Sequence, residues 1–516
     1  MKNVVEKIQK NKVIIIKCII GLLICIPLVN LMEMVVGKLI VNDKSNVYLK
    51  VLFYLMLTST YITVLFRKYL YKYAHAYVFV LIILMGICQV ITTPPVVGIS
   101  WDDEIHYKKS AYISWGSNGE IAPADLELVN HYQTVIYERK EYTQEGRDAW
   151  TAYIDQFHKE NPTLIQNGFK FTKECIAYLP SAFGLALGHM FGMTFTHTFM
   201  LGKFMNILCY ALIISLAIKM LDRGKILAAV IALFPTNIFL AASYSYDWWI
   251  TSFVMLAYAL FLKEIQNNHE ISQKKLLAIL SIMIIALIPK AVYFPLLFPM
   301  MLWKNDRYEN QKICRILVIG AMVVLLASFL IPMLIGGGGG ASDIRGGSDV
   351  NAGAQIKFIL TNPLSYIAVL MRFLFEYLSP DNSWHYATFY AYIGRGSFCS
   401  IALPLLASAC ILDNNAKRVD EKESIWVRAG MFLAVAGSLL LVVTAMYVSF
   451  TPVGHVTVAG CQPRYLLPIF FPGLYFLTKM NLDVSKKLKE TAFIVSAYAL
   501  SFVYFYNMFE LCIIKY

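Results

Sequence analysis

Three carboxylates and an imidazole lie together in residues 101–107, shortly after an apolar run that ends near Thr92. The group consists of Asp102, Asp103, Glu104 and His106. Charged side chains are expensive to place beside hydrocarbon, and where they occur at a membrane boundary they usually mark a functional site. We therefore take this stretch as the centre of a candidate site, with a solvated helix end as the structural alternative.

Three further polar groups stand at the ends of apolar runs, namely Asp247, Lys290 and the stretch Gln462-Pro463-Arg464-Tyr465. Carboxylates and cations at one level of a membrane suit a reaction of an anionic, lipid-linked group. A carboxylate can deprotonate an acceptor hydroxyl, and Arg or Lys can neutralise the phosphate that leaves. Structural alternatives are a helix cap for Asp247, snorkelling for Lys290 and a head-group anchor for Arg464.

From this chemistry we assign catalysis to Asp102, Asp103 and Glu104. We assign substrate binding to His106, Tyr244, Asp247, Lys290, Gln462, Arg464 and Tyr465. No cofactor is required by the residues present. A divalent Mg²⁺ or Mn²⁺ ion held by Asp102, Asp103 and Asp247 is left open, although the number of carboxylates does not demand one.

The composition identifies the chain as an all-α, multi-pass membrane protein. Its 516 residues are 58% hydrophobic, 14% aromatic and only 15% charged, far more apolar than a soluble protein. The net charge of +12 comes mainly from Lys and Arg in short connections between apolar runs, which sets orientation and argues against nucleic acid as a partner.

The apolar runs predict about 13 spans in a bundle that also contains re-entrant or interfacial helices. By the positive-inside rule the N-terminus is cytoplasmic, while the candidate site and the C-terminus are outside the cell membrane. Residues 1–74 form an extra N-terminal pair of spans, and residues 75–516 form the main transmembrane domain.

Two polar segments interrupt this domain on its outer side. Residues 94–174 carry 8 Lys or Arg against 13 Asp or Glu and many aromatics, which predicts a large outer loop of short surface helices rather than a disordered tether. Residues 336–363 begin with five glycines and predict a flexible outer loop.

Four shorter apolar segments need a separate interpretation. Residues 177–195 are broken by a proline and glycines and are interpreted as non-spanning, and residues 364–379 as a helix on the outer surface. Two short apolar runs meet at Pro289-Lys290. A hairpin places Lys290 near the outer surface; the alternative, one long kinked helix, would invert every later loop.

The same residues carry a family likeness. Pro-Pro-x4-Ser-Trp-Asp-Asp-Glu-x-His-Tyr, residues 243–247, Pro-Lys-Ala-Val-Tyr-Phe-Pro and Ala-Gly-Cys-Gln-Pro-Arg-Tyr-Leu-Leu-Pro occur in order along the chain. They resemble the motifs of a large bacterial multispanning family known as domain of unknown function 2142. In that family's first motif an Asp-Glu pair stands where this chain has Asp102-Asp103, and Glu104 is additional.

The family is similar to the GT-C membrane glycosyltransferases. The resemblance implies a GT-C-like bundle whose first outer loop is catalytic, a polyprenyl-phosphate sugar as donor, and a cell-surface glycan, wall polymer or lipid as acceptor. Asp102 or Asp103 would then be the base. A lipid-linked glycan flippase or transporter, and a polysaccharide polymerase or ligase, are the alternative functions.

Overall fold

A computed structural model describes residues 2–41, 46–117, 120–161, 173–266, 270–303, 307–335, 349–379, 387–413, 425–478 and 482–515. Within these ranges the chain is almost entirely helical. Eight helices are long and apolar enough to cross a membrane. They are α1 (Lys2–Val36), α2 (Val47–Phe66), α3 (Ala74–Thr92), α9 (Phe195–Met220), α12 (Asp247–Gln266), α15 (Gln311–Ile335), α20 (Ile425–Ser449) and α22 (Lys486–Phe509).

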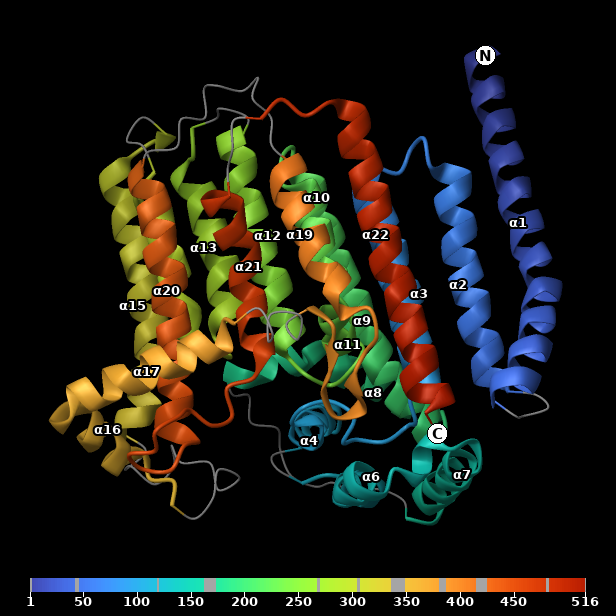
Figure 1. Ribbon diagram of the computed structural model, residues 1–516, viewed down its shortest axis with the longest axis horizontal. Coiled ribbons are helices and arrows are strands. Elements are labelled where there is room, and N and C mark those ends of the chain that lie inside the picture. Colours follow the sequence, from blue (N-terminus) through green and yellow to red (C-terminus); the bar gives the residue numbers. More distant parts are fainter. Residues whose placement is uncertain are drawn as a thin grey trace.

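Shorter helices fill the space between the long ones. They are α8 (Leu179–Met190), α10 (Lys225–Ala232), α11 (Pro235–Ala241), α13 (Gln273–Leu287), η4 (Ala291–Leu297), α14 (Phe298–Met301), α19 (Ala402–Leu412), η9 (Pro463–Leu466) and α21 (Leu467–Leu477). Figure 1 shows α10, α13, α19 and α21 running alongside the long helices.

The predicted count of about 13 spans is not confirmed by these lengths. Among the described residues eight helices qualify, or nine if the bent pair α16 (Ala352–Thr361) and α17 (Pro363–Tyr377) is one broken span. Five of the apolar runs counted among the 13, at 226–242, 276–288, 291–303, 397–412 and 465–478, form shorter pieces in the structure. Prolines explain part of the difference, because Pro235 begins α11 and Pro295 lies inside η4, and proline cannot continue the helical ladder.

The helices differ greatly in how much of their surface is covered. In the apolar window of α12, 78% of the residues are buried, against 22% in α1 and in α15. The core cluster of buried apolar side chains includes most of α10 to α12. We therefore place α12 at the centre of the bundle and α1 and α15 at its lipid-facing edges.

One end of the bundle carries the polar segments. The predicted short helices of the 94–174 loop are confirmed as α4 (Asp103–Ser114), α5 (Pro123–Asn130), α6 (Tyr132–Glu138) and α7 (Gln144–Glu160). In Figure 1 α4, α6 and α7 lie at the end of the bundle opposite the N-terminus, and α17 crosses the end of α20 on the same side. A two-stranded antiparallel ribbon, β1 (Phe389–Tyr390) with β2 (Gly394–Arg395), pairs Phe389 with Arg395.

Remaining short elements are 3-10 or π segments of three to six residues: η1 (Gly37–Val41), η2 (Lys140–Tyr142), η3 (Lys173–Tyr178), η7 (Ala391–Ile393), η8 (Cys399–Ile401) and η10 (Glu510–Ile514). Side-chain caps begin several helices, for example Asn46 on the amide of Leu49 at 3.0 Å before α2. Such caps satisfy amides that the helix leaves without partners.

Two predictions about loops are answered in part. The flexible loop predicted at 336–363 is wrong for 352–361, which form α16, capped by the Asn351 side chain on the amide of Ala354 at 2.9 Å. Residues 336–348 lie outside the described residues. The segment at 177–195 yields α8, which at 12 residues is too short to span, in agreement with its non-spanning interpretation.

Candidate functional site

Four of the predicted residues form one continuous chain of ion pairs. The guanidinium of Arg464 pairs with both carboxylates, through Nη2 to Asp102 Oδ2 at 2.8 Å and through Nε to Asp247 Oδ2 at 2.9 Å. The ammonium of Lys290 lies 3.5 Å from the other oxygen of Asp247. The contacts therefore run in the order Asp102, Arg464, Asp247 and Lys290. We call these four residues, two acidic and two basic, the ion-pair chain.

Exposure divides this ion-pair chain into a buried middle and two accessible ends. The side chains of Arg464 and Asp247 are 3% and 8% exposed, whereas those of Asp102 and Lys290 are 27% and 19% exposed. A carboxylate and an ammonium group are thus presented to a ligand from opposite ends of the ion-pair chain. The buried guanidinium of Arg464 fixes the geometry of the site, because two different nitrogens of its planar group each contact one carboxylate.

Each side chain is positioned by the end of an element. Asp247 is the first residue of α12, Lys290 precedes η4 and Arg464 lies in η9. The hydroxyl of Tyr293 in η4 donates to the carbonyl of Tyr465 at 2.8 Å. This hydrogen bond joins the two elements that carry the cations, so Tyr293 is a positioning residue that the sequence argument did not single out, although it lies in one of the four motifs.

These contacts decide between the alternatives left open by the sequence. Asp247 faces two cations and does not serve only as a cap, Lys290 points toward Asp247, and Arg464 is buried rather than at a lipid surface. The proximity of Lys290 to Asp247 agrees with the predicted hairpin at Pro289-Lys290.

Asp102 has an unusual backbone for a helix N-cap. Its φ of 54° and ψ of 26° lie in the left-handed region, and its side chain makes no capping hydrogen bond. An N-cap aspartate normally accepts from an amide of the first turn. Here the carboxylate extends to Arg464 instead, which leaves it in the site.

Asp103 faces a different environment. It is fully buried, and burial raises the pKa of its carboxyl, an effect opposed by the charge of Lys203 and by nearby backbone amides. Lys203 is on α9 and 3% exposed, with its ammonium 4.4 Å from the Phe199 ring centre. Both carboxylate oxygens of Asp103 are buried and have no hydrogen-bond partner among the described residues, so Asp103 stands apart from the ion-pair chain. Glu104, partly buried on the same turn, is not a member of the ion-pair chain either.

Two of the predicted substrate-binding residues are used inside the protein. Tyr244 is fully buried and donates its hydroxyl to the carbonyl of Phe199 at 2.7 Å. His106 is 5% exposed, lies 2.7 Å from the Tyr178 hydroxyl through Nδ1, and stands edge-on to Tyr246. Direct contact with a substrate does not fit Tyr244, because its hydroxyl already has a partner in the buried core. In His106 one ring nitrogen, Nδ1, is held by Tyr178.

The remaining two predicted residues border the ion-pair chain. The ammonium nitrogen of Lys290 lies 3.5 Å from the centre of the Tyr465 ring. This cation–π contact holds the ammonium group in place. The carbonyl of Gln462 accepts from Tyr377 at 2.7 Å. Its side-chain Oε1 is buried with no hydrogen-bond partner among the described residues, so an acceptor stands next to Arg464.

The structure does not favour a metal between the three aspartates. The Arg464 guanidinium lies between Asp102 and Asp247, and Asp103 is fully buried and is not a member of the ion-pair chain. Within the described ranges no group of three His, Cys, Asp or Glu residues is arranged to hold an ion. The positively charged guanidinium of Arg464 already pairs with the carboxylates of Asp102 and Asp247, so no chemical step is assigned to a metal ion.

The buried position of His106 gives a testable pH dependence. Burial, and then the charge of Arg464, lower the pKa of His106 from 6.5 to about 3. Between these values the unfolded chain binds a proton that the folded chain does not, so stability falls as the pH decreases below 6.5. We expect a loss of up to about 1.4 kcal/mol for each pH unit.

Unfolding temperatures of wild type and His106→Gln, measured in detergent between pH 7 and pH 4, test this expectation. The variant should lose less stability than wild type over this range. Equal slopes for the two proteins would contradict the assignment of a buried neutral imidazole.

Comparison with known proteins identifies a family but no function. The model of a family described as a predicted membrane protein, DUF2142, matches residues 81–471. This range includes all of the ion-pair chain and begins within α3, so α1 and α2 precede it. No match is found among curated proteins or among solved structures. Because the match covers well over half of the chain, this protein belongs to the DUF2142 family of membrane proteins.

Proposed function

We propose that the protein is a membrane glycosyltransferase that moves a sugar from a polyprenyl-phosphate donor to a hydroxyl of a cell-surface glycan, wall polymer or lipid. The observation that carries the proposal is the ion-pair chain with an accessible carboxylate, Asp102, at one end and an accessible cation, Lys290, at the other. Transfer of a sugar from a lipid phosphate needs a base on the acceptor side of the anomeric carbon and a cation on the phosphate side.

The proposed reaction is a single displacement. The acceptor oxygen attacks the anomeric carbon and forms the new C–O bond while its proton passes to the Asp102 carboxylate. The bond from the anomeric carbon to the phosphate oxygen breaks, and the polyprenyl phosphate leaves with that electron pair. Lys290 stabilises the charge that develops on the phosphate, and attack opposite the leaving group inverts the configuration of the sugar.

Arg464 has a positioning role in this scheme. From the sequence we predict that Arg464 and Lys290 both hold the lipid phosphate, but the guanidinium of Arg464 is buried and already paired with two carboxylates. It holds Asp102 toward the acceptor and Asp247 beneath Lys290. The donor phosphate therefore falls to Lys290, with the buried oxygen of Gln462 as an acceptor for a sugar hydroxyl close by.

An orientation in the cell membrane follows from the positive-inside rule. Arg67, Lys68 and Lys72 connect α2 to α3, at the end of the bundle opposite α4 (Figure 1). Basic connections favour the cytoplasmic side. We place the N-terminus inside and the ion-pair chain, together with the C-terminus, outside.

The direct test is release of lipid phosphate by the purified protein. Nanodiscs that contain the protein and a polyprenyl-phosphate hexose are incubated with a cell-surface glycan fraction, and free polyprenyl phosphate is followed by chromatography. We expect acceptor-dependent release of lipid phosphate and a new glycosidic product. Accelerated movement of lipid-linked glycan across proteoliposomes, with no release for any hexose tested, would instead support a transporter.

A further inference from the structure

A cavity of about 250 Å³ opens beside the cationic end of the ion-pair chain. Lys290 and Tyr465 form its polar side. Its other walls are mainly apolar and come from the start of η4 and from α15 and α20, including Val292, Phe329, Val442, Ala445 and Met446. The cavity thus joins a single charged group to an apolar surface.

The position of the cavity places it at the side of the bundle that faces lipid. Residues of α15 such as Val323 and Ile331 are 56% and 51% exposed, and only 22% of the apolar window of this helix is buried, as expected for a helix that faces hydrocarbon. The residues that line the cavity lie near the ends of α15 and α20, at the level of Lys290. A lipid chain in the bilayer can therefore approach Lys290 from the side, between α15 and α20.

We propose that this cavity holds the first isoprene units of the lipid carrier, with the carrier phosphate at Lys290. The inference rests on the proposed function and adds to it the route by which the donor reaches the site. Charge complementarity supports this occupant, because the cavity has one cation at its polar side and apolar walls beyond it. Pockets that enclose a whole ligand measure about 300–1,000 Å³, so this smaller cavity holds only the segment next to the phosphate.

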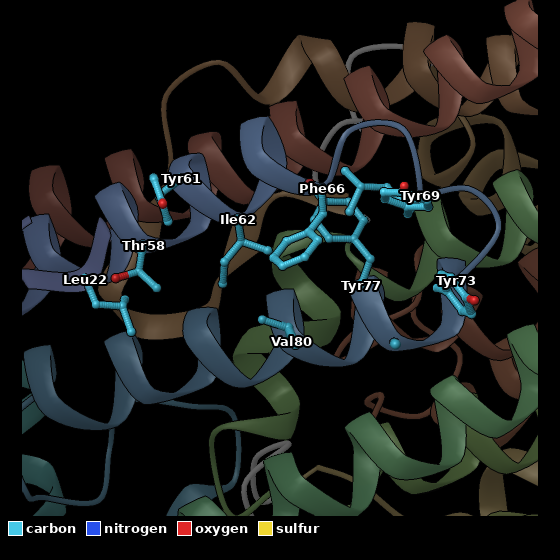
Figure 2. Close-up of a pocket in the computed structure, with 11 residues that line it drawn as sticks. Leu22, Thr58, Tyr61, Ile62, Phe66, Tyr69, Tyr73, Tyr77 and Val80 are labelled. Carbon is cyan, nitrogen blue, oxygen red and sulfur yellow. The ribbon is translucent and has the colours of Figure 1, made fainter. Parts of the chain in front are cut away.

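A second apolar cavity provides a contrast. It has a volume of about 370 Å³ and lies between α1, α2 and α3. Figure 2 shows Ile62, Phe66 and Tyr77 at its centre, with Tyr69 and Tyr73 near the connection from α2 to α3. Its lining contains no Asp, Glu, Lys or Arg. Hydrocarbon fits there, but a phosphate would have no cation, so the carrier is expected at Lys290.

The experiment uses polyprenyl phosphate that carries a photoreactive diazirine in its first isoprene units. The full-length protein in nanodiscs is irradiated with this probe, and the adducts are mapped by mass spectrometry. We expect adducts on α20 near Val442–Met446 or on α15 near Ser328. Excess unlabelled polyprenyl phosphate should lower their yield in the wild-type protein, a readout that needs no variant.

Two variants of α20 then test whether the isoprenoid chain of the probe lies in the cavity. Ala445→Trp fills the cavity and should lower adduct yield about tenfold, a loss of affinity worth about 1.4 kcal/mol. Leu433→Trp is the matched control, because Leu433 lies on the same helix, is 60% exposed and does not line the cavity. Its adduct yield should equal that of wild type.

Lys290→Gln tests recognition of the phosphate independently of recognition of the isoprenoid chain. The variant should weaken labelling by the phosphate probe and leave labelling by the matching uncharged polyprenol unchanged. Adducts in the cavity between α1, α2 and α3, or a yield that Ala445→Trp does not change, would overturn the proposal. Labelling requires no turnover, so adducts at α20 without any sugar transfer would retain the cavity and reject the glycosyltransferase.

Discussion

Replacing Asp102 with asparagine is expected to lower the turnover of sugar transfer by about 10²–10⁴-fold, the usual contribution of a positioned general base. Asparagine keeps the size of the side chain and its contact with Arg464 but cannot accept the acceptor proton. The amount of folded protein in the membrane should not change, because Asp102 is the most exposed member of the ion-pair chain. Lipid-phosphate release and membrane accumulation are the two measurements.

Asp103→Asn serves as the matched comparison, since it makes the same chemical change at the adjacent residue. Asp103 is fully buried and interacts with Lys203. We expect its replacement to lower the unfolding temperature and the accumulation of the protein, because a buried lysine is left without its counter-charge. Full transfer by Asp102→Asn, or loss of turnover by Asp103→Asn with unchanged stability, would contradict the division of roles between the two residues.

Replacement of Arg464 by methionine is expected to have the largest effect on stability. Two carboxylates would lose their shared cation, and Asp247 would stay 8% exposed. Breaking a buried ion pair from one side typically costs about 3–5 kcal/mol. Arg464→Lys should recover only part of this loss, because a single ammonium group cannot reach both carboxylates in the way that the planar guanidinium does.

Thermal unfolding in detergent measures the effect on stability, and lipid-phosphate release measures the effect on transfer. The control is Arg372→Met, which removes an exposed arginine of α17 whose guanidinium donates to the Val456 carbonyl at 3.4 Å. If Arg464→Met unfolds at the same temperature as Arg372→Met, the two ion pairs do not stabilise the fold as described.

The sequence predicts the members of the ion-pair chain better than their roles. Asp247, Lys290 and Arg464 stand out because a charge at the end of an apolar run requires an explanation, and that reasoning needs no coordinates. Asp102 and Asp103 cannot be separated in this way. They are adjacent and chemically identical, and the structure, which has a left-handed turn at Asp102, pairs Asp102 with Arg464 and buries Asp103 completely.

Hydropathy identified the membrane class, and the charged and aromatic residues of 94–174 predicted the short helices of that loop, but neither gave the number of spans. Apolar runs such as 226–242 satisfy a composition test, and yet Pro235 divides that run into two short helices. The surrounding helices bury both pieces almost completely. The burial of such broken segments depends on how the neighbouring helices pack around them. It cannot be predicted from the sequence of one segment alone.

The left-handed backbone at Asp102 also limits which substitutions can be interpreted. Asparagine tolerates positive φ better than most residues, and glycine adopts it freely. Alanine at this position would carry a conformational penalty of about 1–2 kcal/mol that has nothing to do with the carboxylate. An alanine scan would therefore combine two effects at the residue of greatest interest, whereas Asp102→Asn compared with Asp102→Gly separates proton transfer from backbone shape.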